Sequence, residues 1–175
     1  MELIQGLDRG IILFVNEYLI FEPINSMMAF ISWLGNKGFI WILFGILLIV
    51  LGKENRKWGF LLLVSLGITA LLGNVLLKPL VARTRPYDAL DIAIVIERLK
   101  DFSFPSGHTA AAFSAAVILL AMNQKLGIVM VIFAVLMGLS RIYLMVHYPS
   151  DVLAGALLGA GVSAAVLYCY KKKRS

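Results

Sequence analysis

Three separated stretches of the sequence carry groups that bind anions or move protons. They are Lys78-x6-Arg85-Pro86, Pro105-Ser106-Gly107-His108 and Ser140-Arg141-x5-His147-x3-Asp151. Together they supply three cations, two histidines, a serine hydroxyl, a turn glycine and a carboxylate. This combination predicts a site that holds a phosphate and transfers it through a histidine.

The first stretch pairs two cations that suit a phosphate. Lys78 and Arg85 are seven residues apart, about two helical turns, so they can share one face of a helix. Arginine offers phosphate oxygens a planar fork of donors, while lysine acts as a point charge. Taken alone, this stretch is equally well explained by cations that reach toward lipid headgroups from a helix end.

The second stretch has the pattern of a helix start. Ser106 is a candidate N-cap, and Pro105 blocks extension of the helix backward. Free backbone N–H groups at a helix start bind anions, and Gly107 allows a close approach. His108 then falls in the first turn beside the anion. The alternative is an ordinary cap with an interfacial histidine.

The third stretch joins the end of one predicted helix to the start of the next. Arg141 lies in a last turn, His147 lies in the connection 146–150, and Asp151 opens the final helix. Asp151 either caps that helix or accepts a bond from one ring nitrogen of His147, which leaves the other nitrogen free to attack. Both histidines of the chain lie beside cation-bearing motifs, which favours one shared site.

The composition predicts a membrane protein. Of the 175 residues, 61% are hydrophobic and 15% are charged, with a mean hydropathy of +0.90. A soluble domain is closer to half apolar and a quarter charged. The net charge of +6 fits anionic headgroups and a basic site, and no Lys/Arg stripe with interleaved aromatics indicates nucleic acid. The single cysteine, Cys169, excludes an intrachain disulfide.

Long apolar runs predict the helices that position these motifs. A bilayer core requires roughly 20 helical residues. Suitable runs cover residues 58–77, 106–122, 126–144 and 152–170, with a shorter one at 38–52. The stretch before Gly35 forms either one span with an interfacial turn or two surface helices, and we expect a sixth span. The sequence thus predicts an all-α polytopic membrane bundle of about six helices. Three glycines of the last run are expected to mark close helix packing: Gly155, Gly159 and Gly161.

The order of the runs places all three motifs at one membrane face. Lys78 ends one span, Ser106 opens the next, Arg141 ends the following one, and Asp151 opens the last. The basic tail and the basic loop after residue 52 are expected in the cytoplasm by the positive-inside rule. The C-terminus is then cytoplasmic and the site extracytoplasmic.

The three stretches match the signature K-x6-RP, PSGH, SR-x5-H-x3-D at every defining position. In this the chain resembles the type 2 phosphatidic acid phosphatase superfamily, and within it the membrane lipid phosphatases such as bacterial phosphatidylglycerophosphatase B and undecaprenyl pyrophosphate phosphatases. The resemblance implies a single integral-membrane phosphatase domain over residues 1–175. Its motif core is 78–151, and residues 1–35 form an N-terminal helical region without a recognisable signature.

The resemblance also implies a role for each matched residue. His147 would be the nucleophile that forms a phosphohistidine, Asp151 would orient it, and His108 would protonate the leaving oxygen. The phosphate oxygens would be held by Lys78, Arg85, Ser106, Gly107 and Arg141. No metal and no other cofactor are expected, and the sequence shows no carboxylate cluster suited to magnesium.

The expected partners are the lipid bilayer of a bacterial plasma membrane and, as substrate, a membrane lipid phosphate. Candidate substrates are phosphatidylglycerophosphate and phosphatidic acid, with undecaprenyl pyrophosphate as the alternative. With Gly107, the second stretch resembles the enzymes that act on the first two lipids slightly more.

A distant alternative is an anion-conducting transporter, although no charge marks the middle of a predicted span. A vanadate-bearing haloperoxidase is disfavoured because it would be soluble, whereas the hydropathy of this sequence predicts a membrane protein. Residues 92–100 are expected to form a short amphipathic helix over the site, and a proline at Val95 would test it as a substrate gate.

Overall fold

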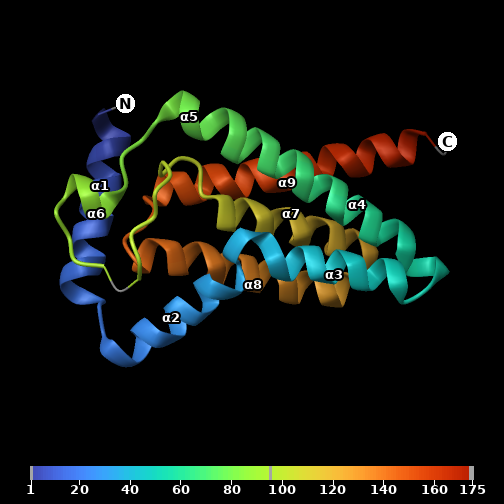
Figure 1. The fold of residues 1–175 in the computed structure, drawn as a ribbon, viewed down its shortest axis with the longest axis horizontal. Helices are drawn as coiled ribbons and strands as arrows, with labels where there is room; N and C mark the ends of the chain where they lie inside the picture. Colours follow the sequence, from blue (N-terminus) through green and yellow to red (C-terminus); the bar gives the residue numbers. More distant parts are fainter. Residues whose placement is uncertain (1, 95, 174–175) are drawn as a thin grey trace.

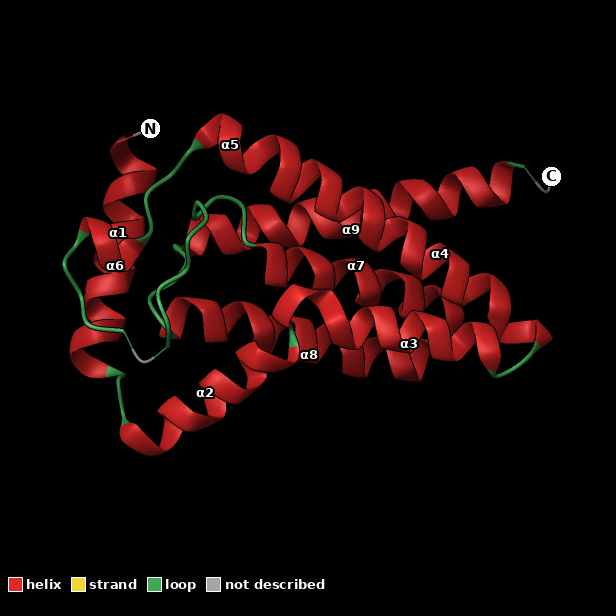
Figure 2. Cartoon of the chain, viewed as in Figure 1, coloured by secondary structure: helices red, strands yellow, loops and turns green. Residues whose placement is uncertain are grey.

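The computed structural model describes residues 2–94 and 96–173, and helices make up most of it (Figures 1 and 2). The long helices are α1 (Glu2–Tyr18), α2 (Glu22–Leu34), α3 (Phe39–Val50), α4 (Lys53–Ala70), α7 (Gly107–Met122), α8 (Gln124–Tyr143) and α9 (Pro149–Lys172). The short ones are a 3-10 turn (Asn36–Gly38), a π-helix (Leu71–Leu77), α5 (Lys78–Val81) and α6 (Pro86–Ala89). The expected all-α bundle of about six helices is confirmed, with α2 and α3 counted as one broken unit.

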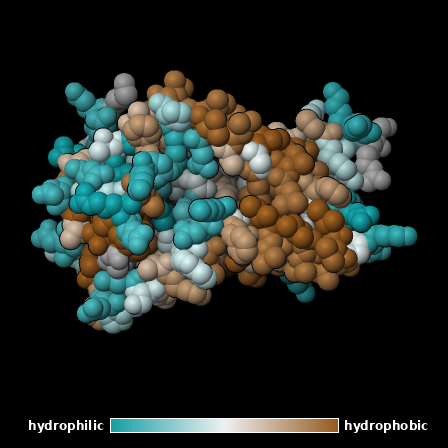
Figure 3. Space-filling model, in the orientation of Figure 1, coloured by the Kyte–Doolittle hydropathy of each residue, from teal (hydrophilic) through white to brown (hydrophobic). Residues whose placement is uncertain are grey.

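The surface of the bundle suits a bilayer. Four described segments are long and apolar enough to cross a membrane: Glu22–Val50, Lys53–Ala89, Gln124–Tyr143 and Pro149–Lys172. The apolar helix α7 is shorter and lies more deeply among the others. Figure 3 shows a broad hydrophobic band between two hydrophilic ends. Helices satisfy their own backbone hydrogen bonds, so apolar side chains can face lipid directly.

The helices α7 and α9 lie in close contact because small residues line both. A Cβ atom added at Gly159 would lie 2.0 Å from the carbonyl oxygen of Ala110, and one at Gly155 would lie 2.5 Å from that of Ser106. Gly161 has open space around it. The expectation of close packing is therefore right for the first two glycines and wrong for Gly161. The contact brings the start of α7 against the start of α9.

Four helix ends meet at one end of the bundle, which we call the site end. The last turn of α5, the first turn of α7, the end of α8 and the start of α9 all lie at the left of Figure 1. Helix α1 lies across this end, and its buried side chains are Asp8, Ile12 and Val15. The stretch before Gly35 thus supplies two helices: α1, and α2, which leads into α3 through a break at residues 35–38.

The loop between α6 and α7 does not contain the expected helix. The described residues 92–94 and 96–100 are irregular, and Val95 lies outside the described residues. Ile92, Ile94 and Ile96 recur with a spacing of two and all pack into the same apolar cluster. That spacing suits an extended chain rather than a helix. The hydroxyl of Tyr87 fixes the loop by bonding both the N–H and the carbonyl of Leu99.

We predict that Gly159→Ala destabilises the bundle while Gly161→Ala does not. The new methyl group at residue 159 meets rigid backbone, so the free energy of unfolding should fall by about 1–3 kcal/mol, the usual cost of overpacking. Thermal unfolding of both variants in detergent measures the effect. Equal melting temperatures would contradict the assigned α7–α9 contact.

Candidate active site

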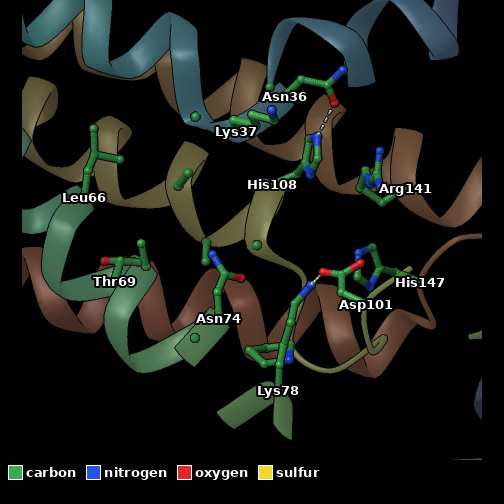
Figure 4. A pocket seen from close by; sticks show the side chains of 18 of the residues that line it. Asn36, Lys37, Leu66, Thr69, Asn74, Lys78, Asp101, His108, Arg141 and His147 are labelled. Atoms are coloured by element: carbon green, nitrogen blue, oxygen red, sulfur yellow. Dashed lines mark hydrogen bonds and ion pairs between the residues drawn. The ribbon is translucent and has the colours of Figure 1, made fainter. Parts of the chain in front are cut away.

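One cavity of about 950 Å³ opens among the helix ends at the site end of the bundle. Figure 4 shows the labelled side chains of Lys78, His108, Arg141 and His147 around it. Six of the eight residues singled out in the sequence line this cavity: Lys78, Arg85, Gly107, His108, Arg141 and His147. The structure therefore brings together groups that lie up to about 70 residues apart in the sequence.

The other two residues lie behind the cavity wall. Ser106 is fully buried and caps α7, since its Oγ accepts from the N–H of Thr109 at 3.4 Å. Its own N–H donates to the carbonyl of Asp151 at 3.0 Å. Asp151 is also fully buried, and its Oδ2 accepts from the N–H of Tyr148 at 2.9 Å. The N-cap expected at Ser106 is confirmed, whereas the N-cap of α9 is Tyr148 and Asp151 bonds its backbone N–H from the third helical position. A direct hydrogen bond joins the starts of the two helices.

His147 stands between a carboxylate and a guanidinium. Its Nδ1 lies 3.7 Å from Oδ2 of Asp151, within ion-pair range but longer than a hydrogen bond. Its Nε2 lies 3.4 Å from Nη1 of Arg85, on the side of the cavity. Burial of the ring, together with the charges of Arg141 and Arg85, lowers the pKa of His147 to about 3 despite Asp151. The imidazole is therefore neutral near pH 7, as a nucleophile requires.

Arg141 is buried with two donors free toward the cavity. Its side chain is 1% exposed, and its Nη1 donates to the hydroxyl of Ser32 on α2. Its Nε and Nη2 have no hydrogen-bond partner among the described residues. An unpaired buried donor is costly, and more so when it is charged. These donors therefore point to an anion as their partner.

Lys78 and Arg85 share the carboxylate of Asp101, a residue that lies outside the three motifs. The Oδ2 of Asp101 accepts from Nζ of Lys78, and its Oδ1 accepts from Nη2 of Arg85 at 2.6 Å. Arg85 is further held by backbone carbonyls, including that of Val146 at 2.6 Å. The two cations hold the pKa of Asp101 well below its usual value, against the effect of its partial burial. A phosphate would meet the same two cations.

His108 is positioned by the break between α2 and α3. Its Nε2 lies 3.1 Å from Oδ1 of Asn36. A Cβ atom at Gly35 would come within 2.8 Å of the imidazole Cδ2, so only glycine leaves room for the ring. A Cβ atom at Gly107 would likewise lie 2.9 Å from Oδ1 of Asn74. The absence of a Cβ atom at Gly107 therefore makes room for the amide of Asn74.

Comparisons with known proteins account for this arrangement. The sequence profile of the PAP2 superfamily matches residues 58–175. The chain belongs to this superfamily. It is 38% identical over 142 residues to undecaprenyl-diphosphatase of Sulfolobus acidocaldarius, covering 80% of this chain and 68% of that protein. It is 34% identical over 154 residues to phosphatidylglycerophosphatase B of Bacillus subtilis, covering 81% and 73%.

A solved PAP2 structure has the same fold. The crystal structure of a transmembrane PAP2-type phosphatidylglycerolphosphate phosphatase from Bacillus subtilis matches with a TM-score of 0.81 and 31% identity. The match covers 98% of this chain and 88% of the other. The protein is therefore an integral-membrane PAP2 lipid phosphatase, as the three motifs indicate.

Several polar residues of this PAP2 site carried no motif signal. Asp101, Asn36 and Ser32 lie outside the three stretches, and each bonds a motif residue. Arg83 lies inside the first stretch, yet its side chain turns away from Arg85 to reach Asp151. The sequence feature that could have identified Arg83 is that it is a third cation, placed between Lys78 and Arg85.

We predict that Asp101→Asn strengthens inhibition by inorganic phosphate. The carboxylate competes with phosphate for Lys78 and Arg85, and the amide removes that charge while keeping the backbone bonds to Arg85. Because Asp101 is half-exposed, the inhibition constant should fall by only about threefold to tenfold.

The matched control is Asp88→Asn, which removes an exposed carboxylate of α6 that pairs with Arg98. It should leave the inhibition constant unchanged. Weaker inhibition of the Asp101→Asn enzyme would show instead that this carboxylate supports phosphate binding.

Proposed function

We propose that the protein hydrolyses membrane lipid phosphates through a phosphohistidine at His147. The observation that carries the proposal is the placement of a neutral imidazole nitrogen, Nε2, 3.4 Å from Nη1 of Arg85 in a cavity lined by Lys78 and Arg141. Phosphoryl transfer depends mainly on positioning and on neutralising the charge of the equatorial oxygens. The site supplies a nucleophile and three cations for this purpose.

In the first step, Nε2 of His147 bonds to phosphorus as the bond from phosphorus to the lipid oxygen breaks. The ring becomes cationic, and the carboxylate of Asp151 near Nδ1 stabilises it. His108 gives its proton to the leaving oxygen, so the lipid departs as a neutral alcohol. The cations Lys78, Arg85 and Arg141 hold the three phosphate oxygens, with the start of α7 at Gly107 beside them.

In the second step, water attacks phosphorus on the side that the alcohol left. His108 takes a proton from this water while the phosphorus–nitrogen bond breaks. The products are inorganic phosphate and neutral His147. His108 thus ends the cycle protonated, as it began.

The apolar part of the cavity suits a lipid chain. Beyond the cations, its walls come from α3, α4 and α7, with Ile42, Leu63 and Leu66 among them. A chain held there keeps its phosphate at the polar end beside His147. We propose phosphatidylglycerophosphate and phosphatidic acid as substrates, and phosphatidylglycerophosphatase B among the relatives supports this.

A second candidate substrate is undecaprenyl pyrophosphate, hydrolysed by the same steps with a phosphate as the leaving group. The observation that favours it is the name of the 38% identical relative from Sulfolobus acidocaldarius, an undecaprenyl-diphosphatase. The two kinds of candidate substrate differ in the leaving group and in the lipid chain, whereas the proposed chemistry at His147 is common to both.

We further propose that the site faces the extracytoplasmic side of a bacterial plasma membrane, with the C-terminus in the cytoplasm. The basic residues Lys171 and Lys172 close α9 at the end of the bundle opposite the site (Figure 1). The first turns of α4, which carry Lys53, Arg56 and Lys57, lie at that same end. Basic residues gather on the cytoplasmic side of membrane proteins.

We predict that lipid phosphate release survives EDTA and disappears in His147→Ala. The cations of the protein supply the charge neutralisation, and the nucleophile is a side chain. Purified protein in detergent would be given phosphatidylglycerophosphate, phosphatidic acid and undecaprenyl pyrophosphate separately, and the rates would rank them. Release that is lost with EDTA, or that is indifferent to His147, would contradict the mechanism.

We predict the orientation from cysteine labelling in a Cys169→Ser background. In intact cells a membrane-impermeant maleimide should label Lys100→Cys, at the site end, and should label Arg56→Cys only after permeabilisation. Both positions are exposed. The opposite pattern would place the site in the cytoplasm.

A further inference from the structure

The carboxylate of Asp151 is held by several groups besides His147. Its Oδ1 accepts from Nη1 of Arg83 at 2.5 Å. Its Oδ2 accepts from the hydroxyl of Ser103 at 2.5 Å and from the N–H of Tyr148 at 2.9 Å. Asp151 is fully buried, so these bonds fix its orientation before it acts on His147. Of these donors, only Arg83 carries a full positive charge.

Arg83 also connects Asp151 to helix α1. Its Nη2 donates to Oδ2 of Asp8 at 2.7 Å, and Asp8 is only 2% exposed. Asp8 in turn accepts from the N–H and the hydroxyl of Ser150, at 3.0 and 2.5 Å. The guanidinium lies over the ring of Tyr148, with Cζ 4.0 Å from the ring centroid. One arginine is therefore clamped between carboxylates from α1 and α9.

We propose that Arg83 and Asp8 are positioning residues for the pair His147 and Asp151. Arg83 holds one oxygen of Asp151, which leaves the other oxygen 3.7 Å from Nδ1 of His147. Asp8 holds Arg83, so α1 takes part in setting the catalytic geometry without touching the substrate. This inference rests on the proposed function, because it assumes that His147 forms the phosphohistidine.

The charges explain why two acids share one arginine. Arg83 with Asp151 alone would form a neutral pair and weaken the attraction between Asp151 and a cationic His147. Asp8 restores a net negative charge to this cluster. That charge is useful once His147 bonds to phosphorus, because the ring then becomes positive and a fixed negative neighbour stabilises it. Asp8 thus affects the transition state more than the binding of the phosphate.

Helix α1 supports the position of Arg83 through its packing as well as through the charge of Asp8. The helix lies across the site end of the bundle (Figure 1) and buries Ile12 and Val15 along with Asp8. It contacts α8 and α9, the two helices that flank His147. A shift of α1 would therefore move Arg83 relative to Asp151.

The test compares steady-state kinetics and melting temperatures of full-length variants in detergent. Arg83→Gln should lower kcat for the best lipid substrate by about 10–100-fold with KM unchanged, the range seen when the partner that orients a reactive group is lost. Asp8→Asn should lower kcat by about threefold to tenfold, since it removes a charge one residue farther away. Arg83→Lys should recover part of the loss, because lysine keeps the charge and reaches only one carboxylate.

Two matched controls remove a charge elsewhere. Glu17→Gln changes an exposed acid of α1, and Arg56→Gln changes an exposed arginine at the far end of the bundle; both should retain the normal kcat. A normal kcat with a lowered melting temperature in Asp8→Asn and Arg83→Lys would overturn the inference, and these two variants decide it if Arg83→Gln does not fold. Activity that persists in His147→Ala would instead overturn the proposed function itself.

Discussion

The site is built on the confinement of like charges at the end of an apolar bundle. Lys78 and Arg85 are close enough to share one carboxylate, and Arg141 lines the same cavity. Two unit charges about 4 Å apart repel by roughly 4 kcal/mol at an effective dielectric constant of about 20. The fold withstands this repulsion through Asp101, the hydroxyl of Ser32 and the carbonyl of Val146. Within the described part of the chain these partners leave two donors of Arg141 unpaired, and a phosphate is the natural complement to them.

Rigid helix ends make that confinement possible. The close contact of α7 and α9 brings the N–H of Ser106 into a hydrogen bond with the carbonyl of Asp151, so the proposed phosphate-binding turn and the proposed catalytic carboxylate are joined through the backbone. The last turn of α8 carries Arg141 and the short connection from α8 to α9 carries His147, and both line the cavity. Arg85 lies in the connection between α5 and α6, where the backbone carbonyls of Asp101 and Val146 hold its guanidinium in place.

Hydropathy and motif spacing predicted the bundle and the gathering of the motifs, because both depend on where apolar runs begin and end. The residues that hold the motif groups were beyond the reach of such patterns. Asp101 and Asp8 are single acids in unremarkable surroundings, and only the tertiary fold brings them to Lys78 and Arg83. The described residues of the stretch 92–100 form no helix, because the isoleucines there follow a spacing of two, a pattern that composition alone conceals.

The division of the chain explains why the chemistry transfers between PAP2 proteins more readily than the substrate. Residues 58–175 match the superfamily and contain every group that contacts the phosphate in the proposed mechanism. Part of the cavity wall comes from residues before this segment, including Gly35, Asn36 and Ile42. Those residues face His108 and the apolar region, where the leaving alcohol and its chain would lie. We therefore expect selection of the lipid chain to depend on walls that lie outside the three motifs.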